Sequence, residues 1–405
     1  MLASNHYFPP FSEAEYKRRH SVLAEEMKKA ELDCLVVYGA VVLGGSDTGQ
    51  INAQYLSNYA GVGCSYVVFP ADDDPTLHLS VPLHAENARD IGYIQDIRGG
   101  THLELTICQR LNELKLYKGR IGIVGPNVQH FLPCTIPYEH HMCIQKTFPD
   151  AELRDVSEWY EAIRAIKSDE EISLMEKAAK LNDLCHEEMF QATRPGMSHA
   201  DLRRVVEEIT FKHKGNYCMM HLSSWPNGQP HLPYPDFWPT DRTVEKDHVL
   251  MSEMPVGYGM YSTKIMGTYF TGEPTREYRD MFELAASVHK QVISELKPGM
   301  KGSDVAQFMG LFREAGVAAS HMVSGWSNYN SLPFVGQTDP NALGGEVQSH
   351  LDYVFKPGLC VQVMSYPIIP GFSGGLWVGS TCVFTENGLR ELNKYPVRDL
   401  RIINS

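Results

Sequence analysis

Arg194-Pro195-Gly196-Met197, followed by Asp201-Leu202, recurs in this chain as Lys297-Pro298-Gly299-Met300, followed by Asp304-Val305. The two copies lie 103 positions apart, and His186 and His289 share this spacing upstream. A Pro-Gly turn that opens a new amphipathic helix at a fixed interval is typical of a repeated supersecondary unit. The sequence therefore predicts an internal duplication, and the crevice between two duplicated halves is a natural place for a functional site.

The bulk composition excludes several classes of protein. The chain has 405 residues, of which 43% are hydrophobic, and this predicts two or three globular units. A formal net charge of −13 argues against a nucleic-acid partner, which would need a basic face. No apolar run approaches the ~18 residues of a membrane span, and the nine cysteines form no CxxC pair and fit reduced thiols. We expect a cytoplasmic protein that binds neither nucleic acid nor membrane.

The order of helical and strand-like patterns divides the chain near residue 158. Residues 1–158 alternate the two patterns, which predicts a small α/β domain. Residues 159–405 contain the duplicated segment and are expected to form an α+β domain. The strand-like runs lie at 34–38, 65–69, 77–81 and 120–124 in the first part, and at 247–257, 261–270, 359–369 and 375–385 in the second.

An ordered series of motifs carries a family resemblance. Arg164-Ala165-Ile166-Lys167-Ser168-Asp169-Glu170-Glu171-Ile172 is followed by the two Pro-Gly-Met helix starts, then by Lys356-Pro357-Gly358 and Thr385-Glu386-Asn387-Gly388. Together they resemble the "pita-bread" family of creatinase, prolidase and methionine aminopeptidase. The resemblance covers most of the chain. It implies a creatinase-like amino-terminal domain followed by a pseudo-twofold catalytic domain.

The same resemblance implies five metal ligands in the metallopeptidase members: two aspartates eleven residues apart, a histidine and two glutamates. This sequence departs from that pattern at each position. Glu253 and Lys264 stand in place of the aspartates, Gly325-Trp326-Ser327 in place of the histidine segment, and Met364 and either Gly379 or Ser380 in place of the glutamates. Because an ammonium, an indole and a thioether do not bind hard divalent cations, we expect no active-site metal and no other cofactor.

Creatinase is similar in lacking a metal, and its catalytic histidine lies on a turn between the two halves. His231, between Pro230 and Pro233, stands there in this chain and is the predicted acid/base. The glutamates of creatinase's guanidinium clamp correspond to Met266 and Met364, so creatine is not the expected substrate. The resemblance also implies a homodimer.

Two further groups of residues complete the predicted site. Glu253 and Lys264 are candidates either for catalysis or for a retained ion pair. An apolar, aromatic lining that binds the substrate, or else plain core, is expected from Tyr258, Tyr261, Met266, Trp326 and Met364, with His321 close by. His221 lies on a short apolar run and is interpreted as a core histidine rather than a functional one.

These observations lead to one leading hypothesis and two alternatives. The leading hypothesis is a metal-independent, creatinase-like hydrolase in which His231 cleaves a C–N bond of a small organic compound other than creatine. One alternative is a metal-free lyase that acts on a small aromatic or apolar substrate. The other is a catalytically inactive homologue that binds a small molecule.

Overall fold

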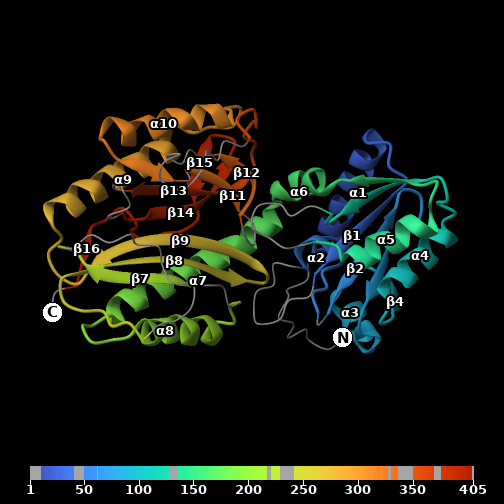
Figure 1. The fold of residues 1–405 in the computed structure, drawn as a ribbon, viewed down its shortest axis with the longest axis horizontal. Helices are drawn as coiled ribbons and strands as arrows, with labels where there is room; N and C mark the ends of the chain where they lie inside the picture. Colours follow the sequence, from blue (N-terminus) through green and yellow to red (C-terminus); the bar gives the residue numbers. More distant parts are fainter. Residues whose placement is uncertain are drawn as a thin grey trace. The chain divides into compact units, whose positions relative to one another are not determined.

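The computed structural model describes residues 11–40, 50–61, 63–126, 135–216, 220–228, 241–320, 322–326, 330–335, 350–368 and 375–403. The chain divides into two compact units, Met1–Arg164 and Ala165–Ser405. The boundary drawn from the sequence at residue 158 falls inside helix α6 (Ser157–Ala165). Figure 1 shows the elements of both units. In the part of the chain that the structure describes, no helix is long and apolar enough to cross a membrane.

The first unit is a six-stranded mixed sheet with helices on both faces. The strands have the order β4-β3-β2-β1-β5-β6. Their bounds are Cys34–Gly39 (β1), Ser65–Pro70 (β2), Thr76–Leu79 (β3), Asp96–Gly99 (β4), Arg120–Val124 (β5) and Glu152–Asp155 (β6). The helices are α1 (Glu13–Lys29), α2 (Ile51–Ser57), η2 (Pro82–His84), α3 (Ala85–Ile91), α4 (Leu103–Glu113), α5 (Tyr138–Thr147) and α6.

Alternation along β1 explains the two layers of helices. Leu35 and Val37 join a core with α1 and α2, whereas Cys34 and Val36 join a second core with α4 and α5. A strand buried on both faces is an almost continuous apolar run, and this is why the sequence identified it. The α/β architecture expected for the amino-terminal part is confirmed.

The second unit is a ten-stranded sheet that is largely antiparallel, with the order β12-β11-β13-β14-β9-β8-β7 along its main path. The strands are β7 (His221–Pro226), β8 (His248–Tyr258), β9 (Tyr261–Phe270), β10 (Ala318–Ser320), β11 (Val323–Trp326), β12 (Asn330–Val335), β13 (Cys360–Ile368), β14 (Val378–Thr385), β15 (Gly388–Glu391) and β16 (Arg401–Ile402). The helices are α7 (Asp169–Ala192), α8 (His199–Lys212), α9 (Arg276–Glu295) and α10 (Gly302–Glu314).

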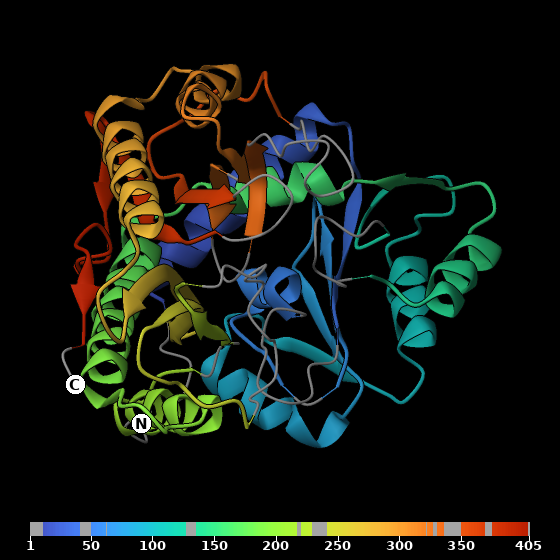
Figure 2. The ribbon, with the colours of Figure 1, turned by 60° about the vertical axis from the view of Figure 1, so that its left-hand side comes forward.

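The duplication is visible as two equivalent helix pairs, α7–α8 and α9–α10, which lie on the outside of the sheet (Figure 2). Gly196 and Gly299 have φ values of 90° and 88°, a left-handed conformation that favours glycine. Asp201 then accepts the backbone N–H of Ser198 at 3.1 Å, and Asp304 accepts that of Lys301 at 2.7 Å. The repeated Pro-Gly-Met and Asp residues therefore build the same turn and helix cap twice.

The helix-covered face of this sheet has a buried histidine in each half. His289 on α9 contacts Ser380 Oγ through Nε2 at 3.2 Å and accepts an N–H of Arg398 through Nδ1 at 3.0 Å. In the other half, Nε2 of His186 on α7 has no partner among the described residues. A Cβ built on Gly267 would lie 3.5 Å from its ring. The two halves therefore differ in how each buried imidazole is satisfied.

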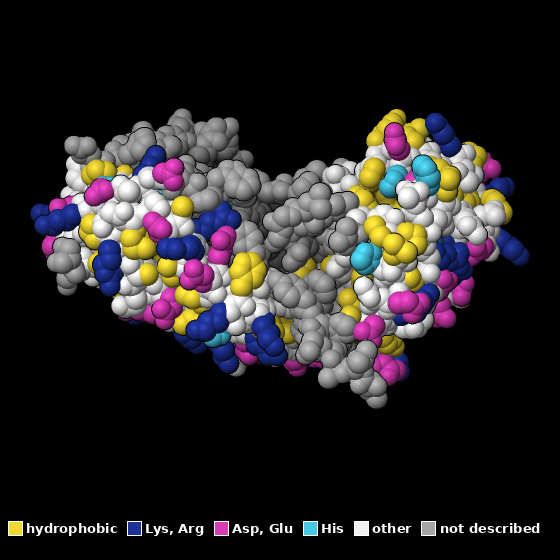
Figure 3. Space-filling model, turned by 90° about the horizontal axis from the view of Figure 1, so that it is seen from below, with side chains coloured by type: hydrophobic (Ala, Val, Ile, Leu, Met, Phe, Trp, Pro, Cys, Tyr) yellow, Lys and Arg dark blue, Asp and Glu magenta, His cyan; other side chains and the backbone are white. Residues whose placement is uncertain are grey.

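Basic and acidic side chains are interspersed over the described surface in the view of Figure 3. The view from below shows no continuous basic stripe on the described residues of that face. This agrees with the net charge of −13, which gives the chain no electrostatic reason to attract phosphate.

Candidate functional site

The hairpin of β8 and β9 carries an ion pair at its centre. Gly259 and Met260 both have positive φ values, 58° and 69°, which is the tight two-residue turn that joins twisted antiparallel strands. This turn brings Glu253 and Lys264 together, although they are eleven residues apart. Nζ of Lys264 donates to Oε1 of Glu253 at 2.7 Å.

The surroundings of this pair hold the ammonium firmly and leave the carboxylate partly open. The Lys264 side chain is 3% exposed, whereas that of Glu253 is 21% exposed. Nζ of Lys264 lies 4.8 Å from the ring centroid of Trp326, and Nε1 of that indole donates to the backbone oxygen of Ser262 at 2.9 Å. An indole face stabilises a desolvated cation. The carboxylate of Glu253 and the indole ring of Trp326 together hold the Lys264 ammonium in place.

The register of five strands places one residue from each in a single row. His221 on β7 pairs with Glu253 on β8, which pairs with Met266 on β9. Met266 pairs with Gly379 on β14, which pairs with Met364 on β13. Directly opposite residues point to the same face of a sheet and are ~4.5–5.5 Å apart at Cβ. One half of this row is therefore polar and the other half is apolar.

His221 contributes an imidazole at the polar end of the row. Burial lowers the pKa of His221 below its ordinary value of 6.5; Glu253 opposes this shift and Lys264 adds to it. The imidazole is therefore neutral at pH 7 and can both donate and accept a proton. Sequence reasoning took His221 for a core histidine, but the structure places it directly across from Glu253.

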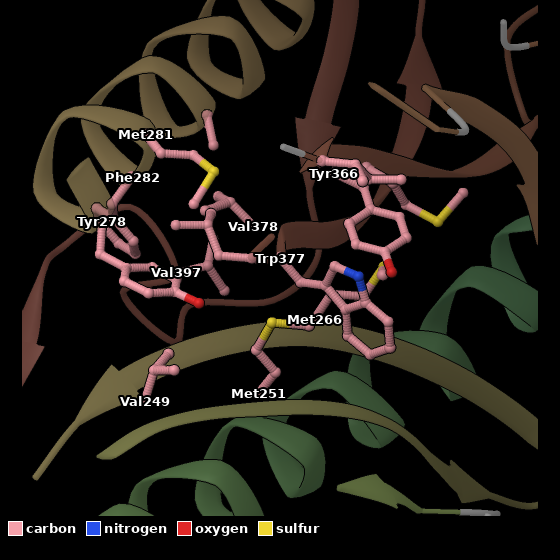
Figure 4. Packing of buried hydrophobic residues seen from close by; sticks show 14 of the residues in the cluster. Val249, Met251, Met266, Tyr278, Met281, Phe282, Tyr366, Trp377, Val378 and Val397 are labelled. Carbon is pink, nitrogen blue, oxygen red and sulfur yellow. The ribbon is translucent and has the colours of Figure 1, made fainter. Parts of the chain in front are cut away.

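The apolar end of the row joins the main core of the second unit. Met266 and Met364 are each 4% exposed and pack with Tyr366 and Trp377. Figure 4 shows Met266 beside Trp377, with Tyr366 across the indole. The rings of Tyr366 and Trp377 meet edge to face at 5.1 Å between centroids. This end of the row offers only carbon and sulfur.

The space at Gly379 is filled by its neighbour on β9. A Cβ built there would lie 3.0 Å from the backbone oxygen of Val363 and 3.2 Å from Cβ of Met266. Both contacts are tighter than most contacts of a real Cβ, so a side chain at this position requires the Val363 backbone or Met266 to shift by a few tenths of an ångström. Met266 therefore takes the room that a glutamate at 379 would need.

The donor set of the row does not fit a pair of divalent cations. Glu253 is already neutralised by an ammonium, and beside it the row offers one imidazole, two thioethers and a glycine, which is too few hard donors for two cations. Among the described residues, no group of three or more His, Cys, Asp and Glu side chains could hold a metal ion.

Two of the predicted substrate-binding residues lie elsewhere. Tyr258 and Tyr261 pair across the end of the hairpin, and Tyr261 donates to Glu171 of α7 at 2.8 Å. Nζ of Lys177, also on α7, lies 5.7 Å from the ring centroid of Tyr258. Both tyrosines thus point to the helix-covered face, away from the row. Their role in substrate binding stays a prediction.

The two remaining predicted histidines, His231 and His321, lie outside the described residues. Their proposed roles, like those of Glu253, Lys264, Met266, Trp326 and Met364, stay predictions. What the structure adds is that Lys264 contacts both Glu253 and Trp326, and that Met266, which pairs with Glu253, shares a core with Met364. Trp326 itself packs in a different core, with Met175 and Ala179 of α7.

Comparison with known families then identifies the lineage. Residues 173–386 match the family described as "Metallopeptidase family M24", and residues 19–166 match "Creatinase/Prolidase N-terminal domain". The chain belongs to metallopeptidase family M24. The expected creatinase and prolidase relationship and the two-domain pita-bread fold are both confirmed.

Relatives of this M24 chain include a creatinase and several Xaa-Pro dipeptidases. The creatinase of Bacillus sp. (strain B-0618) is 24% identical over 96% of this chain and 92% of the relative. An Xaa-Pro dipeptidase of Lactobacillus delbrueckii subsp. lactis is 24% identical over 64% of this chain and 70% of the relative. The solved Xaa-Pro dipeptidase from Bacillus anthracis has a TM-score of 0.76 at 18% identity, over 96% of this chain and 99% of that one.

These comparisons correct the functional hypothesis drawn from the sequence. Most of the relatives and solved structures with a stated activity are Xaa-Pro dipeptidases or prolidases, which points to peptide hydrolysis within a family of hydrolases. The expected metal-independent cleavage of a non-peptide C–N bond is therefore wrong. The replaced metal ligands suggested a non-peptide reaction, but residues 173–386 still belong to a family of peptidases.

Proposed function

We propose that this M24 protein hydrolyses a peptide bond in a short peptide that carries proline or another compact apolar residue at the scissile bond. The observation that supports the proposal is the row from His221 to Met364. It sets an acid/base group beside an apolar surface on one face of the sheet. The Xaa-Pro dipeptidases among the relatives supply the substrate class.

In this proposal the polar half of the row does the proton chemistry. The partly exposed carboxylate of Glu253 accepts a proton from the attacking water. Lys264 stabilises the negative charge that develops on the carbonyl oxygen. Neutral His221 accepts the proton from Glu253 on one ring nitrogen and gives the proton of its other ring nitrogen to the leaving nitrogen, so that both side chains return to their starting states. No step is assigned to a metal ion, because the described residues do not fit one.

The apolar half of the row selects the substrate. Met266 and Met364 pack with Tyr366 and Trp377, and their thioether side chains carry no strong hydrogen-bonding group. A proline ring has no side-chain polar group and loses nothing by lying against such a surface, whereas a charged side chain would lose its hydration. We expect the protein to act as a homodimer, which light scattering at twice the chain mass would check.

The test is proline release from Xaa-Pro dipeptides. Purified protein is incubated with Ala-Pro and, as a matched substrate, Ala-Glu, each with Mn²⁺, with Zn²⁺ and with a chelator. We expect proline release, and a loss of ~10²-fold or more in Glu253→Gln and in His221→Asn. Glu187→Gln removes a carboxylate bound to Arg401 at 2.6 Å, away from the row, and is expected to leave the rate unchanged. Equal losses in Glu187→Gln and Glu253→Gln would contradict the assignment.

A further inference from the structure

Two cysteines of the first unit are in thiol contact. Cys108 lies on α4 and Cys143 on α5, and their sulfur atoms are 3.8 Å apart. Cys108 is 6% exposed, whereas Cys143 is half-buried, so Cys143 is the more accessible residue of the pair.

Packing around the two helices keeps the thiols together. Ile107 and Leu111 of α4 lie in the same core as Ile144 of α5 and Phe148 that follows it. A disulfide needs ~2.05 Å between its sulfur atoms, so a shift of less than 2 Å closes the gap. Rotation about the Cα–Cβ bond of either cysteine moves its Sγ and is the simplest source of such a shift.

The two thiols differ in a way that sets the order of reaction. Burial raises the pKa of Cys108 to about 12, and a hydrogen bond from Thr147 lowers it only in part. Cys108 is therefore protonated at neutral pH, and a reagent meets the more accessible Cys143 first.

We propose that Cys108 and Cys143 are a reversible thiol–disulfide site that reacts with low-molecular-weight disulfides. Cys143 loses its proton to solvent and attacks one sulfur of the reagent, so a Cys143–reagent disulfide forms and one reagent thiolate leaves. Cys108 then loses its proton and attacks Sγ of Cys143; the mixed disulfide breaks, the second reagent thiolate leaves, and the Cys108–Cys143 bond forms. The two cysteines are oxidised and one reagent disulfide is reduced to two thiols.

Cys64 provides a matched control within the same unit. It is half-buried like Cys143, but its sulfur contacts the hydroxyl of Tyr38 at 3.3 Å. The same reagent is expected to leave Cys64 unmodified or as a mixed disulfide, never cross-linked to Cys108. The comparison therefore separates contact between thiols from simple exposure.

The experiment treats the reduced full-length protein with oxidised glutathione, blocks the remaining thiols by alkylation and maps the peptides without reduction. We expect a Cys108–Cys143 cross-linked peptide, a loss of at least two titratable thiols out of nine, and full reversal by dithiothreitol. Cys64→Ser is expected to keep the cross-link, and Cys143→Ser to abolish it. Oxidised wild-type protein is also expected to melt several degrees higher, since the bond closes a loop of about 35 residues.

Three results would overturn the proposal. One is a stable glutathione adduct on Cys143 with no bond to Cys108. Another is a link from Cys143 to a different cysteine. The third is complete alkylation of both cysteines after exposure to the oxidant. Because the wild-type map alone distinguishes these results, the test does not depend on either variant folding.

Discussion

Removing one partner of the Glu253–Lys264 pair is expected to lower the free energy of unfolding by more than removing both partners does. Two unit charges 2.7 Å apart attract by ~6 kcal/mol at an effective dielectric constant of ~20. Removing one partner of a buried pair costs ~3–5 kcal/mol, because the other charge stays without compensation. We expect ~3 kcal/mol for Lys264→Met, since Glu253 keeps some water, and ~4 kcal/mol for Glu253→Gln, since Lys264 is 3% exposed.

The double variant Glu253→Gln/Lys264→Met removes both charges and is expected to cost only ~2 kcal/mol, which is a coupling energy of ~5 kcal/mol. Urea unfolding followed by tryptophan fluorescence measures the four free energies of the cycle. Glu273 and Arg279, 2.9 Å apart but 77% and 41% exposed, form the control cycle with an expected coupling of ~0.5 kcal/mol. If the changes in unfolding free energy of the two single variants add up to that of the double variant, the pair contributes no interaction energy to the stability of this hairpin.

Three further predictions follow from the helix-covered face and the row. Gly267→Ser is expected to raise stability by ~1–2 kcal/mol, because a glycine is lost from the unfolded chain and the new hydroxyl lies near Oγ of Ser252, which is 3.6 Å from the added Cβ and has no partner among the described residues; thermal melting measures this. Burial lowers the pKa values of His186 and His289 to about 3 and about 4, so below pH 6.5 the unfolded imidazoles bind protons that the folded ones exclude. The free energy of unfolding is therefore expected to fall by ~1.4 kcal/mol per pH unit for each histidine, and urea midpoints between pH 8 and 5 measure this. Gly379→Glu is expected to destabilise by ~2 kcal/mol or more, and adding Met266→Ala to recover part of that loss in the same unfolding assay.

Each of these three predictions has its own contrary outcome. Gly267→Ala is the control for the serine, and an equal gain in both variants would show that the hydroxyl finds no partner. A urea midpoint that stays flat from pH 6.5 to 5 would mean that the buried imidazoles take up protons in place. For Gly379→Glu, an unchanged stability would show that Met266 moves aside easily.

The local chemistry of the repeat was readable from the sequence because it depends on neighbours in the chain. Gly196 and Gly299 need their left-handed conformation for a turn of a few residues. Asp201 and Asp304 each accept a hydrogen bond from the backbone N–H of the N-cap residue three positions earlier. Period-two counting could also have placed Tyr258 on the face opposite Glu253, since an odd number of positions separates them along one strand.

The partners across the sheet could not be predicted in the same way. His221 meets Glu253 only because β7 and β8 pair in one register, and their separation of 32 positions does not reveal that register. The fit of Met266 over Gly379 joins residues 113 positions apart. Such contacts depend on the packing of several strands at once, so the sequence indicated which residues replace the metal ligands but not what those residues contact.

Backbone pairing fixes the positions of the five residues in the row relative to one another. Backbone hydrogen bonds set the spacing between its positions, whatever residue stands at each. Exchange of a carboxylate for a thioether at one of these positions therefore changes the chemistry of the site without moving the backbone. Single substitutions within this fold can therefore change the reaction that it catalyses. New side chains that are engineered at these five positions would keep the same spacing.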